Sequence, residues 1–332
     1  MIASSIVGWT PRPSVTCYGD SDGRGVHPTI VFSACFGEWI EPPMKRFTST
    51  FLVLAMVFDS LPVALGEGDK PPIDAKPEPK VVSPLRKLMD ESLTWTELFA
   101  DERSATPMTS RVVMRWANNT RGSEDGMTVL LLSAGRPEAV YCAYPWMNNL
   151  LHEYDSLSRG SLIAKRDGVV VWSPEKPGVT FHAIPDADAP GETPALRLRQ
   201  MKGFAAQFSS TMLGWKADKS DREELRLLPQ PLYRYESTRS DLLDGAVFGF
   251  VQGTDPETLL MLEAFKVGDR LGWQFAFARR TSGELEGRHK DKIVWHADRF
   301  PSNDNPLSTH RTLSRPLEPS LVEALKQKDA AP

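Results

Sequence analysis

The sequence predicts an α+β protein in which antiparallel strands dominate and a unit of one helix plus a β-meander occurs twice. Two helix starts, Ser83-Pro84 and Thr193-Pro194, each precede a block of short strand-like runs. Turn residues such as Asp167-Gly168 separate these runs, as is typical of hairpins. A sheet of this kind has one face that needs cover, which the preceding helix can supply. We therefore expect one or more curved sheets covered by helices.

Both helices begin with the pattern of an N-cap followed by proline at the first helical position. Apolar residues continue at helical spacing after Ser83-Pro84, and we expect that helix to extend towards Phe99. After Thr193-Pro194, a stripe at three- and four-residue steps predicts a longer helix with its apolar face in the core. That stripe consists of Met201, Phe204, Ala205, Phe208 and Met212.

The strand-like runs are rich in β-branched and aromatic residues and are bounded by turn residues. The Asp-Gly dipeptide at residues 167–168, which lies between two apolar segments, is the strongest of these hairpin signals. We expect strands at residues 111–116, 127–132, 139–144, 162–165, 169–172, 179–184, 225–228, 232–235, 246–251, 259–265, 273–278 and 293–295.

The two strand-rich blocks resemble each other in the placing of their turns. Arg115-Trp116 precedes Asp125-Gly126 by the distance at which Arg234-Tyr235 precedes Asp244-Gly245. We interpret this as an internal duplication with units at about 83–185 and 193–298. The alternative is that such turns recur by chance, because they are common in any β-rich chain.

Composition sets limits on the class of protein. The 332 residues are 41% hydrophobic and 25% charged, and the formal net charge is −4, which are ordinary globular values. Mild acidity offers no basic face for nucleic acid, so we expect no nucleic-acid partner.

The segment Met44–Gly66 has the layout of a secretory signal peptide, with a short basic start, an apolar run and small residues at its end. Residues 1–43 then read as a disordered extension that comes from a start assigned too early. Residues 67–82 read as a disordered linker, 83–298 as the duplicated domain and 299–332 as a mobile tail with a short helix at Pro319–Lys328. An exported protein, periplasmic or extracellular and without a stable membrane anchor after cleavage, follows from this interpretation. An uncleaved anchor, or a chance apolar segment in a cytoplasmic protein, would give the same pattern.

Cys142 is the one cysteine that lies beyond the expected signal, since Cys17 and Cys35 precede it. A lone cysteine forms no internal disulfide, and a zinc site needs several ligands. Because Cys142 sits in an apolar run, we expect a buried thiol.

The densest group of acid, base and ligand side chains is His152-Glu153-Tyr154-Asp155. Metal chemistry would need further ligands at set spacing, and the sequence contains no HExxH motif. Beyond residue 66 it also contains no GxSxG elbow, P-loop or GxGxxG motif. We therefore expect no metal site, no cofactor site and no catalytic residues, with His152, Glu153 and Asp155 as the one catalytic alternative against a surface loop.

The run Glu223–Ala264, with Arg197–Leu213 before it, resembles uncharacterised secreted proteins of planctomycete-type bacteria. The resemblance covers most of residues 84–297 and implies export without an established activity. A helix, a strand with Pro-x-x-Tyr-Arg-Tyr, an Asp-Gly turn and another strand are also similar to LolA/LppX-type periplasmic carriers. That similarity implies a curved antiparallel sheet around a lipid or acyl chain.

The sequence leads us to expect a non-enzymatic exported protein that binds or carries an apolar or lipid-like ligand, or an envelope protein. One alternative is a secreted hydrolase with a site around His152 and Asp155. Another is a scaffold module of an envelope complex, which would expose an apolar patch.

Overall fold

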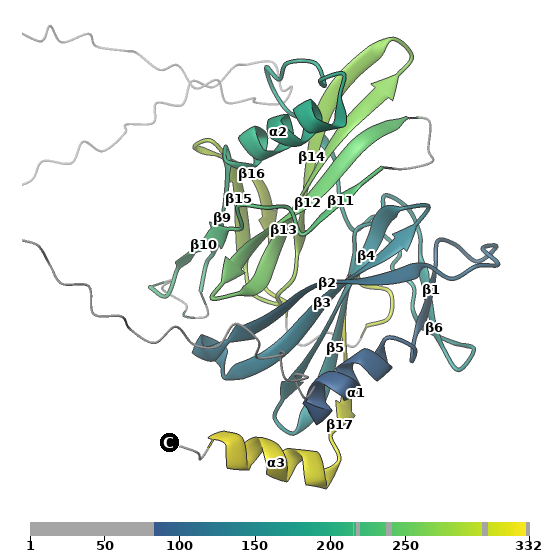
Figure 1. The fold of residues 1–332 in the computed structure, drawn as a ribbon, viewed down its shortest axis with the longest axis vertical. Coiled ribbons are helices and arrows are strands. Elements are labelled where there is room, and N and C mark those ends of the chain that lie inside the picture. Colours follow the sequence, from purple (N-terminus) through teal and green to yellow (C-terminus); the bar gives the residue numbers. More distant parts are fainter. Residues whose placement is uncertain (1–82, 215, 217–219, 237–240, 301–304, 330–332) are drawn as a thin grey trace, which may run out of the picture. The chain divides into compact units, whose positions relative to one another are not determined.

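A computed structural model describes residues 83–214, 216, 220–236, 241–300 and 305–329. The expected extension at 1–43, the signal at 44–66 and the linker at 67–82 lie outside the described residues. The described chain is mostly antiparallel β-strand with few helices (Figure 1), which confirms the β-rich class. The helices are α1 (Pro84–Ser92), the 3-10 turn η1 (Asn119–Arg121), α2 (Pro194–Ala205) and α3 (Pro319–Asp329).

The strands pair in antiparallel fashion in three sheets. In the five-stranded sheet the order is β17 (His310–Pro316), β5 (Asn149–Ser156), β4 (Arg136–Trp146), β3 (Ser123–Ser133) and β2 (Thr109–Asn118). The nine-stranded sheet, curled into a half barrel, has the order β16 (Lys292–Ala297), β15 (Leu285–His289), β9 (Phe208–Met212), β10 (Glu223–Leu227), β12 (Leu242–Gln252), β13 (Asp255–Val267), β14 (Arg270–Arg279) and β8 (His182–Ala183), with β11 (Tyr233–Tyr235) paired to β12. The third sheet has the order β1 (Glu97–Phe99), β6 (Ile163–Arg166) and β7 (Val169–Trp172).

The short-range signals of the sequence are confirmed where they are strongest. The Ser83 hydroxyl accepts a hydrogen bond from the backbone N–H of Arg86, and Thr193 does the same for Leu196, so both are N-caps. Asp167 and Gly168 join β6 to β7 with φ values of 50° and 78°, as a two-residue hairpin turn requires.

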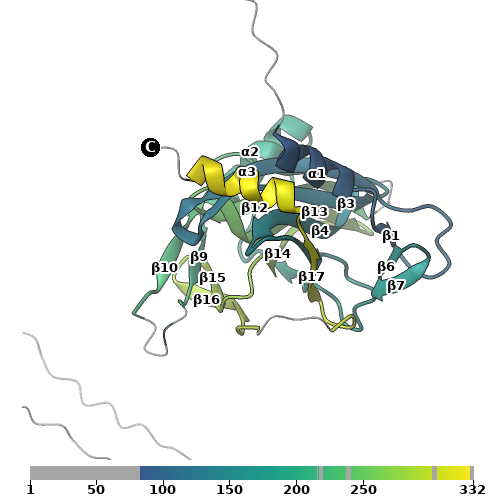
Figure 2. The same ribbon diagram turned by 90° about the horizontal axis from the view of Figure 1, so that it is seen from below.

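Apolar side chains on one face of the five-stranded sheet share a cluster with residues of α1. Met127, Val129 and Leu131 alternate along β3 and pack in one cluster with Leu85 and Met89 of α1. The partly buried Leu321, Val322 and Leu325 of α3 pack against the same cluster. Figure 2 shows α1 and α3 together on one side of the molecule. The period of two along each strand decides which residues reach this face.

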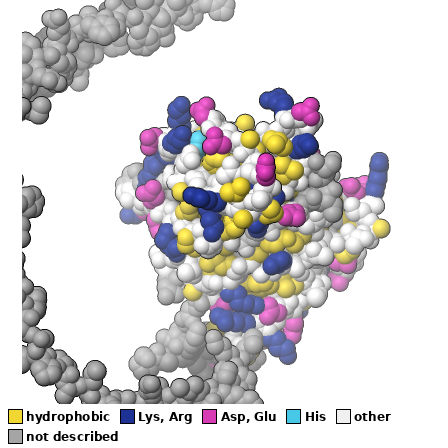
Figure 3. Space-filling model, turned by 45° about the horizontal axis from the view of Figure 1, so that its top comes forward, with side chains coloured by type: hydrophobic (Ala, Val, Ile, Leu, Met, Phe, Trp, Pro, Cys, Tyr) yellow, Lys and Arg dark blue, Asp and Glu magenta, His cyan; other side chains and the backbone are white. Residues whose placement is uncertain are grey.

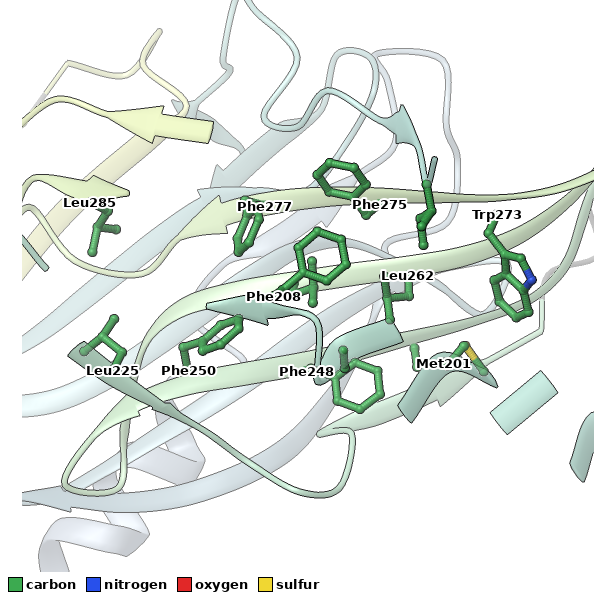
Figure 4. Packing of buried hydrophobic residues seen from close by; sticks show 14 of the residues in the cluster. Met201, Phe208, Leu225, Phe248, Phe250, Leu262, Trp273, Phe275, Phe277 and Leu285 are labelled. Atoms are coloured by element: carbon green, nitrogen blue, oxygen red, sulfur yellow. The ribbon is translucent and has the colours of Figure 1, made fainter. Parts of the chain in front are cut away.

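The nine-stranded sheet buries one face in an aromatic cluster (Figure 4). The Phe208 ring lies 4.8 Å from the ring of Phe275 and 5.7 Å from that of Phe277, centroid to centroid. Met201 and Ala205 of α2 complete the cluster above β12 and β13. Rings at such tilted or edge-on distances add to the stability that burial of their area provides.

The opposite faces of the two sheets pack against each other. Leu130 and Val140 of the five-stranded sheet share a cluster with Val247, Leu259 and Met261 of the nine-stranded sheet. We call this region the seam. It follows that central strands have both faces buried, and that a charged side chain on the seam face needs a partner.

Glu263 supplies the clearest case of such pairing. Its carboxylate is 1% exposed and lies 2.9 Å from the Arg136 Nε atom, which comes from the other sheet. The Tyr235 hydroxyl and the Gln274 amide donate to it at 3.0 and 2.9 Å, and Arg159 forms a second ion pair. Both carboxylate oxygens are therefore satisfied, which a buried charge requires.

Two expected helix ends differ from the structure. The first helix ends at Ser92, and Phe99 pairs with Ile163 in a strand. The stripe that was expected to remain helical through Met212 changes at Ala206, where α2 is capped, and continues as β9. Residues four apart share a face in a strand as well as in a helix, so Phe208 and Met212 still enter the expected core.

The C-terminal segment also differs from the expected mobile tail. His310–Pro316 forms β17, which pairs with β5 along its whole length. The following α3 packs against the cluster under α1. The reason lies in the edge of β5, whose backbone donors and acceptors find their partners in this segment.

The surface drawn in Figure 3 shows acidic and basic side chains interspersed, with apolar side chains between them. Neither sign of charge gathers on this face. Among the described residues, no helix is both long enough and apolar enough to cross a bilayer.

The seam predicts a large difference between two carboxylate substitutions. Glu263→Ala leaves the 3% exposed Arg136 without its buried counter-ion, and we expect a loss of about 3–5 kcal/mol in the free energy of unfolding. Asp90→Ala removes an exposed ion pair with Arg115 and should cost less than about 1 kcal/mol. Urea unfolding of both variants measures this, and equal losses would contradict the assignment of Glu263 to the seam.

Candidate functional site

A cavity of about 760 Å³ lies where residues of both large sheets meet. The five-stranded sheet contributes Trp116, Tyr144 and Glu153 to its walls, and the nine-stranded sheet contributes Glu223, Asp255 and Glu257. A volume of this size fits a small molecule. Because its walls combine aromatic rings with carboxylates, we treat it as the candidate site.

Strand alternation brings the first set of side chains to the cavity. On β4, Cys142 and Tyr144 line the cavity, whereas Tyr141 and Ala143 belong to the cluster under α1. On β5, Glu153 is paired opposite Cys142 and shares its face. The same pleat that fills the core with apolar residues therefore turns polar residues into the cavity.

The turn between β12 and β13 positions the second set. Gly253 has a φ of 59°, which glycine adopts at low cost, and Thr254 follows it. The Thr254 hydroxyl donates to the Ala117 carbonyl at the end of β2, and the Ala117 N–H donates back to that hydroxyl, each at 2.9 Å. These two hydrogen bonds join the sheets and fix the position of Asp255 and Glu257 at the start of β13.

The carboxylates of the cavity differ in the hydrogen bonds that their oxygens accept. Glu153 accepts from the Tyr144 hydroxyl at 2.8 Å, and Asp255 accepts from the Asn118 amide at 3.3 Å. One oxygen of Glu257, Oε1, lies 3.3 Å from the Arg121 guanidinium but accepts no hydrogen bond. Glu257 is 1% exposed, so this oxygen is a buried acceptor without a donor.

Burial dominates the proton affinity of these two acids. Burial raises the pKa of Asp255 well above its usual range, and the negative charge of Glu257 adds to the effect. Burial also raises the pKa of Glu257, to about 7, against the opposing charge of Arg121. Burial in a poorly solvated wall therefore favours the protonated forms of both acids, and a cation placed beside them would favour the ionised forms.

A second group of buried polar residues lies beside the cavity. Asp155 accepts from His310 Nδ1 at 2.6 Å and forms an ion pair with Arg280 through its other oxygen. Burial lowers the pKa of His310 to about 4, so its ring is neutral at neutral pH and donates from Nδ1. Its Nε2 atom then accepts from the Thr312 hydroxyl at 3.4 Å, and Thr312 lines the cavity.

His152 lies elsewhere. Its Nδ1 atom is 2.6 Å from the Tyr141 hydroxyl, which is 2.7 Å from that of Ser92. Ser92 donates to the Met89 carbonyl at the end of α1, so the chain of donors runs from His152 to the helix. Burial lowers the pKa of His152 to about 4 and keeps it neutral. This histidine supports the packing of α1 and does not reach the cavity face.

The structure thus separates the residues that the sequence grouped. His152 and Asp155 are three positions apart on β5 and therefore project from opposite faces of the sheet. Glu153 and Asp155 share the cavity side, and the partner of Asp155 is His310 from β17. His310 stood in the expected mobile tail, and Asp255 and Glu257 stood between the strands expected at 246–251 and 259–265, so sequence reasoning missed them. The Asp-Pro-Glu spacing, which puts two acids on one face of a strand, was the available signal.

Cys142 is a buried free thiol, as expected, and burial raises its pKa. Three or more His, Cys, Asp or Glu side chains that could hold a metal ion do not occur together in the part of the chain that the structure describes.

Comparison with protein-family models, with curated proteins and with solved structures gives no match. The resemblance to secreted planctomycete-type proteins and to periplasmic carriers therefore stays a prediction.

The raised pKa of Glu257 predicts a loss of stability with increasing pH. In the folded chain Glu257 keeps its proton up to about pH 7, whereas in the unfolded chain it ionises near pH 4.5. The stabilisation that protonated Glu257 gives the folded chain is therefore complete below about pH 4.5 and is lost as the pH rises through 7. Between these values the free energy of unfolding falls by up to about 1.4 kcal/mol per pH unit. Urea unfolding between pH 5 and 8 should show a flatter slope for Glu257→Gln than for the wild type.

Glu97→Gln, at an exposed position on β1, provides the control and should keep the wild-type slope. Parallel slopes for the wild type and Glu257→Gln would show that Glu257 does not hold its proton in the folded chain.

Proposed function

We propose that the protein is an exported, non-enzymatic binding protein that takes up a small polar molecule in the cavity. The observation that carries the proposal is the cavity wall itself, in which aromatic rings and buried carboxylates face a space of about 760 Å³. Such walls supply apolar contact together with a few placed polar groups, as ligand sites do.

A polar ligand suits this cavity better than the apolar or lipid-like ligand expected from the sequence. The outer faces of both large sheets are filled by the chain's own side chains, Phe208 and Met201 among them (Figure 4). The open space between the sheets is lined by Glu153, Asp255 and Glu257. An acyl chain there would desolvate carboxylates without offering them a hydrogen bond, which is unfavourable.

We also propose that the fold arose by duplication, so that each helix and its meander form one unit. Two recurring contacts support this. Trp116 pairs opposite Gly126, and Tyr235 pairs opposite Gly245, and a Cβ on either glycine would collide with the ring across from it. In addition, an arginine of the preceding helix binds the aspartate before each glycine, Arg86 with Asp125 at 2.5 Å and Arg197 with Asp244 at 2.9 Å.

Export remains a proposal that rests on the Met44–Gly66 pattern, which lies outside the described residues. A periplasmic or extracellular location would suit a binding protein, since small polar solutes are met there. An envelope protein as the partner is the alternative within the same proposal.

A blocked cavity tests the binding function. Ser282 lines the cavity and is partly buried, so Ser282→Trp should fill part of it. Ser314 is exposed on β17 and does not line the cavity, so Ser314→Trp is the matched control. Native mass spectrometry with agmatine, glucose, citrate and oleate should detect a bound polar compound with the wild type and the control. We expect Ser282→Trp to lose it by about tenfold in affinity or more.

Thermal unfolding of both variants confirms that each is folded. If none of the four compounds binds, or if binding is the same in Ser282→Trp, the proposal is wrong. Binding of oleate in place of a polar compound would restore the lipid-like ligand expected from the sequence.

The second candidate is a hydrolase, and the Asp155–His310–Thr312 arrangement favours it. An acid, a histidine and a hydroxyl in series are the parts of a nucleophilic site. The ion pair of Asp155 with Arg280 argues for a structural role, because Arg280 neutralises the negative charge that would otherwise stabilise an imidazolium at His310. Turnover of p-nitrophenyl acetate that is lost in Thr312→Val and retained in Thr309→Val would establish the hydrolase.

A further inference from the structure

Two hairpins place the same kind of turn against the seam, one in each large sheet. In the first, Arg136-Pro137-Glu138 begins β4, and Pro137 pairs with Leu132. In the second, Asp255-Pro256-Glu257 begins β13, and Pro256 pairs with Val251. A register shift precedes each proline pair, between Leu131 and Leu132 and between Phe250 and Val251. The two segments therefore occupy equivalent places in their hairpins.

The first of these places is closed by a cation from the chain itself. The Arg136 guanidinium donates to Glu263 across the seam and to Glu138 on its own strand, each at 2.9 Å. The remaining space is about 10 Å³, too small for a ligand. A guanidinium held between carboxylates thus fills this end of the seam.

The second place is open because its residues differ. Asp255 stands where the first hairpin has Arg136, so no guanidinium projects from that position. Glu257 stands where the first hairpin has Glu138, and its Oε1 atom accepts no hydrogen bond. Instead of a space of about 10 Å³, this end holds the cavity of about 760 Å³.

A second polar atom of the cavity wall, besides Glu257 Oε1, lacks a hydrogen-bond partner. Ser123 lines the cavity and is 3% exposed, and its hydroxyl has no hydrogen-bond partner within the described chain. Buried polar atoms of this kind are satisfied by a ligand or by water. Ser123 and Glu257 therefore indicate, independently of the charge of the wall, that the cavity holds a polar group.

The charge of the wall selects the sign of that group. Carboxylates outnumber guanidinium groups in the lining, and Arg280 is paired with Asp155 while Arg121 lies against Glu257. Trp116 and Tyr144 form an aromatic wall with ring centroids 5.6 Å apart. Aromatic faces and carboxylates both attract an organic cation.

We infer that the cavity binds a small organic cation, with a guanidinium or primary ammonium group, whose charge lies at Glu257, beside Asp255, as that of Arg136 lies at Glu138. This inference rests on the proposed binding function and names its ligand class. The hydrocarbon part of the ligand lies along Trp116 and Tyr144. The charged group donates to Glu257 Oε1, which the chain leaves without a donor.

Isothermal titration calorimetry of the purified protein tests the inference with two matched pairs of probes. Methylguanidinium and butylammonium carry the expected charge, and N-methylurea and 1-butanol are their neutral counterparts. We expect both cations to bind and both neutral probes to bind at least about tenfold more weakly. At pH 8, Glu257→Gln should weaken cation binding by about tenfold or more, since it replaces an acceptor that is ionised above about pH 7 with a neutral amide.

Glu138→Gln is the matched control, because it changes the equivalent residue at the closed end of the seam. It should leave cation binding unchanged, and thermal unfolding confirms that both variants are folded. Unchanged binding in Glu257→Gln would overturn the inference.

The panel also separates the two proposals. If glucose, citrate or a neutral probe binds in the cavity and the cations do not, the inference fails while the binding function stands. If no compound binds the wild type at all, both fail.

Discussion

The burial of both faces of the central strands is the constraint on which the rest of the structure depends. Most of the buried apolar side chains of β3, β4, β12 and β13 belong either to a cluster on the outer face or to the seam between the sheets. Apolar residues fill the middle of the seam, and charged residues at its ends must be paired. At one end Arg136 pairs with Glu263, and at the other Asp255 and Glu257 face a cavity. The candidate site is thus the end of the seam that the chain leaves unfilled.

The carboxylates at that end combine two properties that are costly in a folded protein. Burial raises the pKa of both Asp255 and Glu257, and Glu257 Oε1 lacks a hydrogen bond. Groups with these properties are therefore candidates for a functional site. The nearby group of Asp155, Arg280 and His310 has its charges matched and contrasts with them. Asp255 and Glu257 therefore suit the binding of a ligand, as proposed, whereas Asp155, Arg280 and His310 suit a structural role beside the cavity wall.

Much of the fold could be predicted from local patterns, because caps, hairpin turns and strand periodicity act over a few residues. The caps at Ser83 and Thr193 and the Asp167-Gly168 turn are examples. The candidate site could not be predicted in this way, since its residues come from strands that are far apart in the sequence. His152 and Asp155 looked like one group but lie on opposite faces, and the partner of Asp155 is His310 of the C-terminal strand. The stripe from Met201 to Met212 shows a related limit, because residues four apart share a face in both helix and strand.

The central claim is the proposal that the two ends of the seam are equivalent and differ in whether an arginine of the proline turn itself fills them. The crystal structure of an Asp255→Arg variant tests it most directly, because this substitution gives the open end the residue of the closed end. We predict that the introduced guanidinium lies in the cavity and donates to Glu257, as Arg136 donates to Glu138. An introduced side chain that turns to solvent, with the cavity unchanged, would contradict the account.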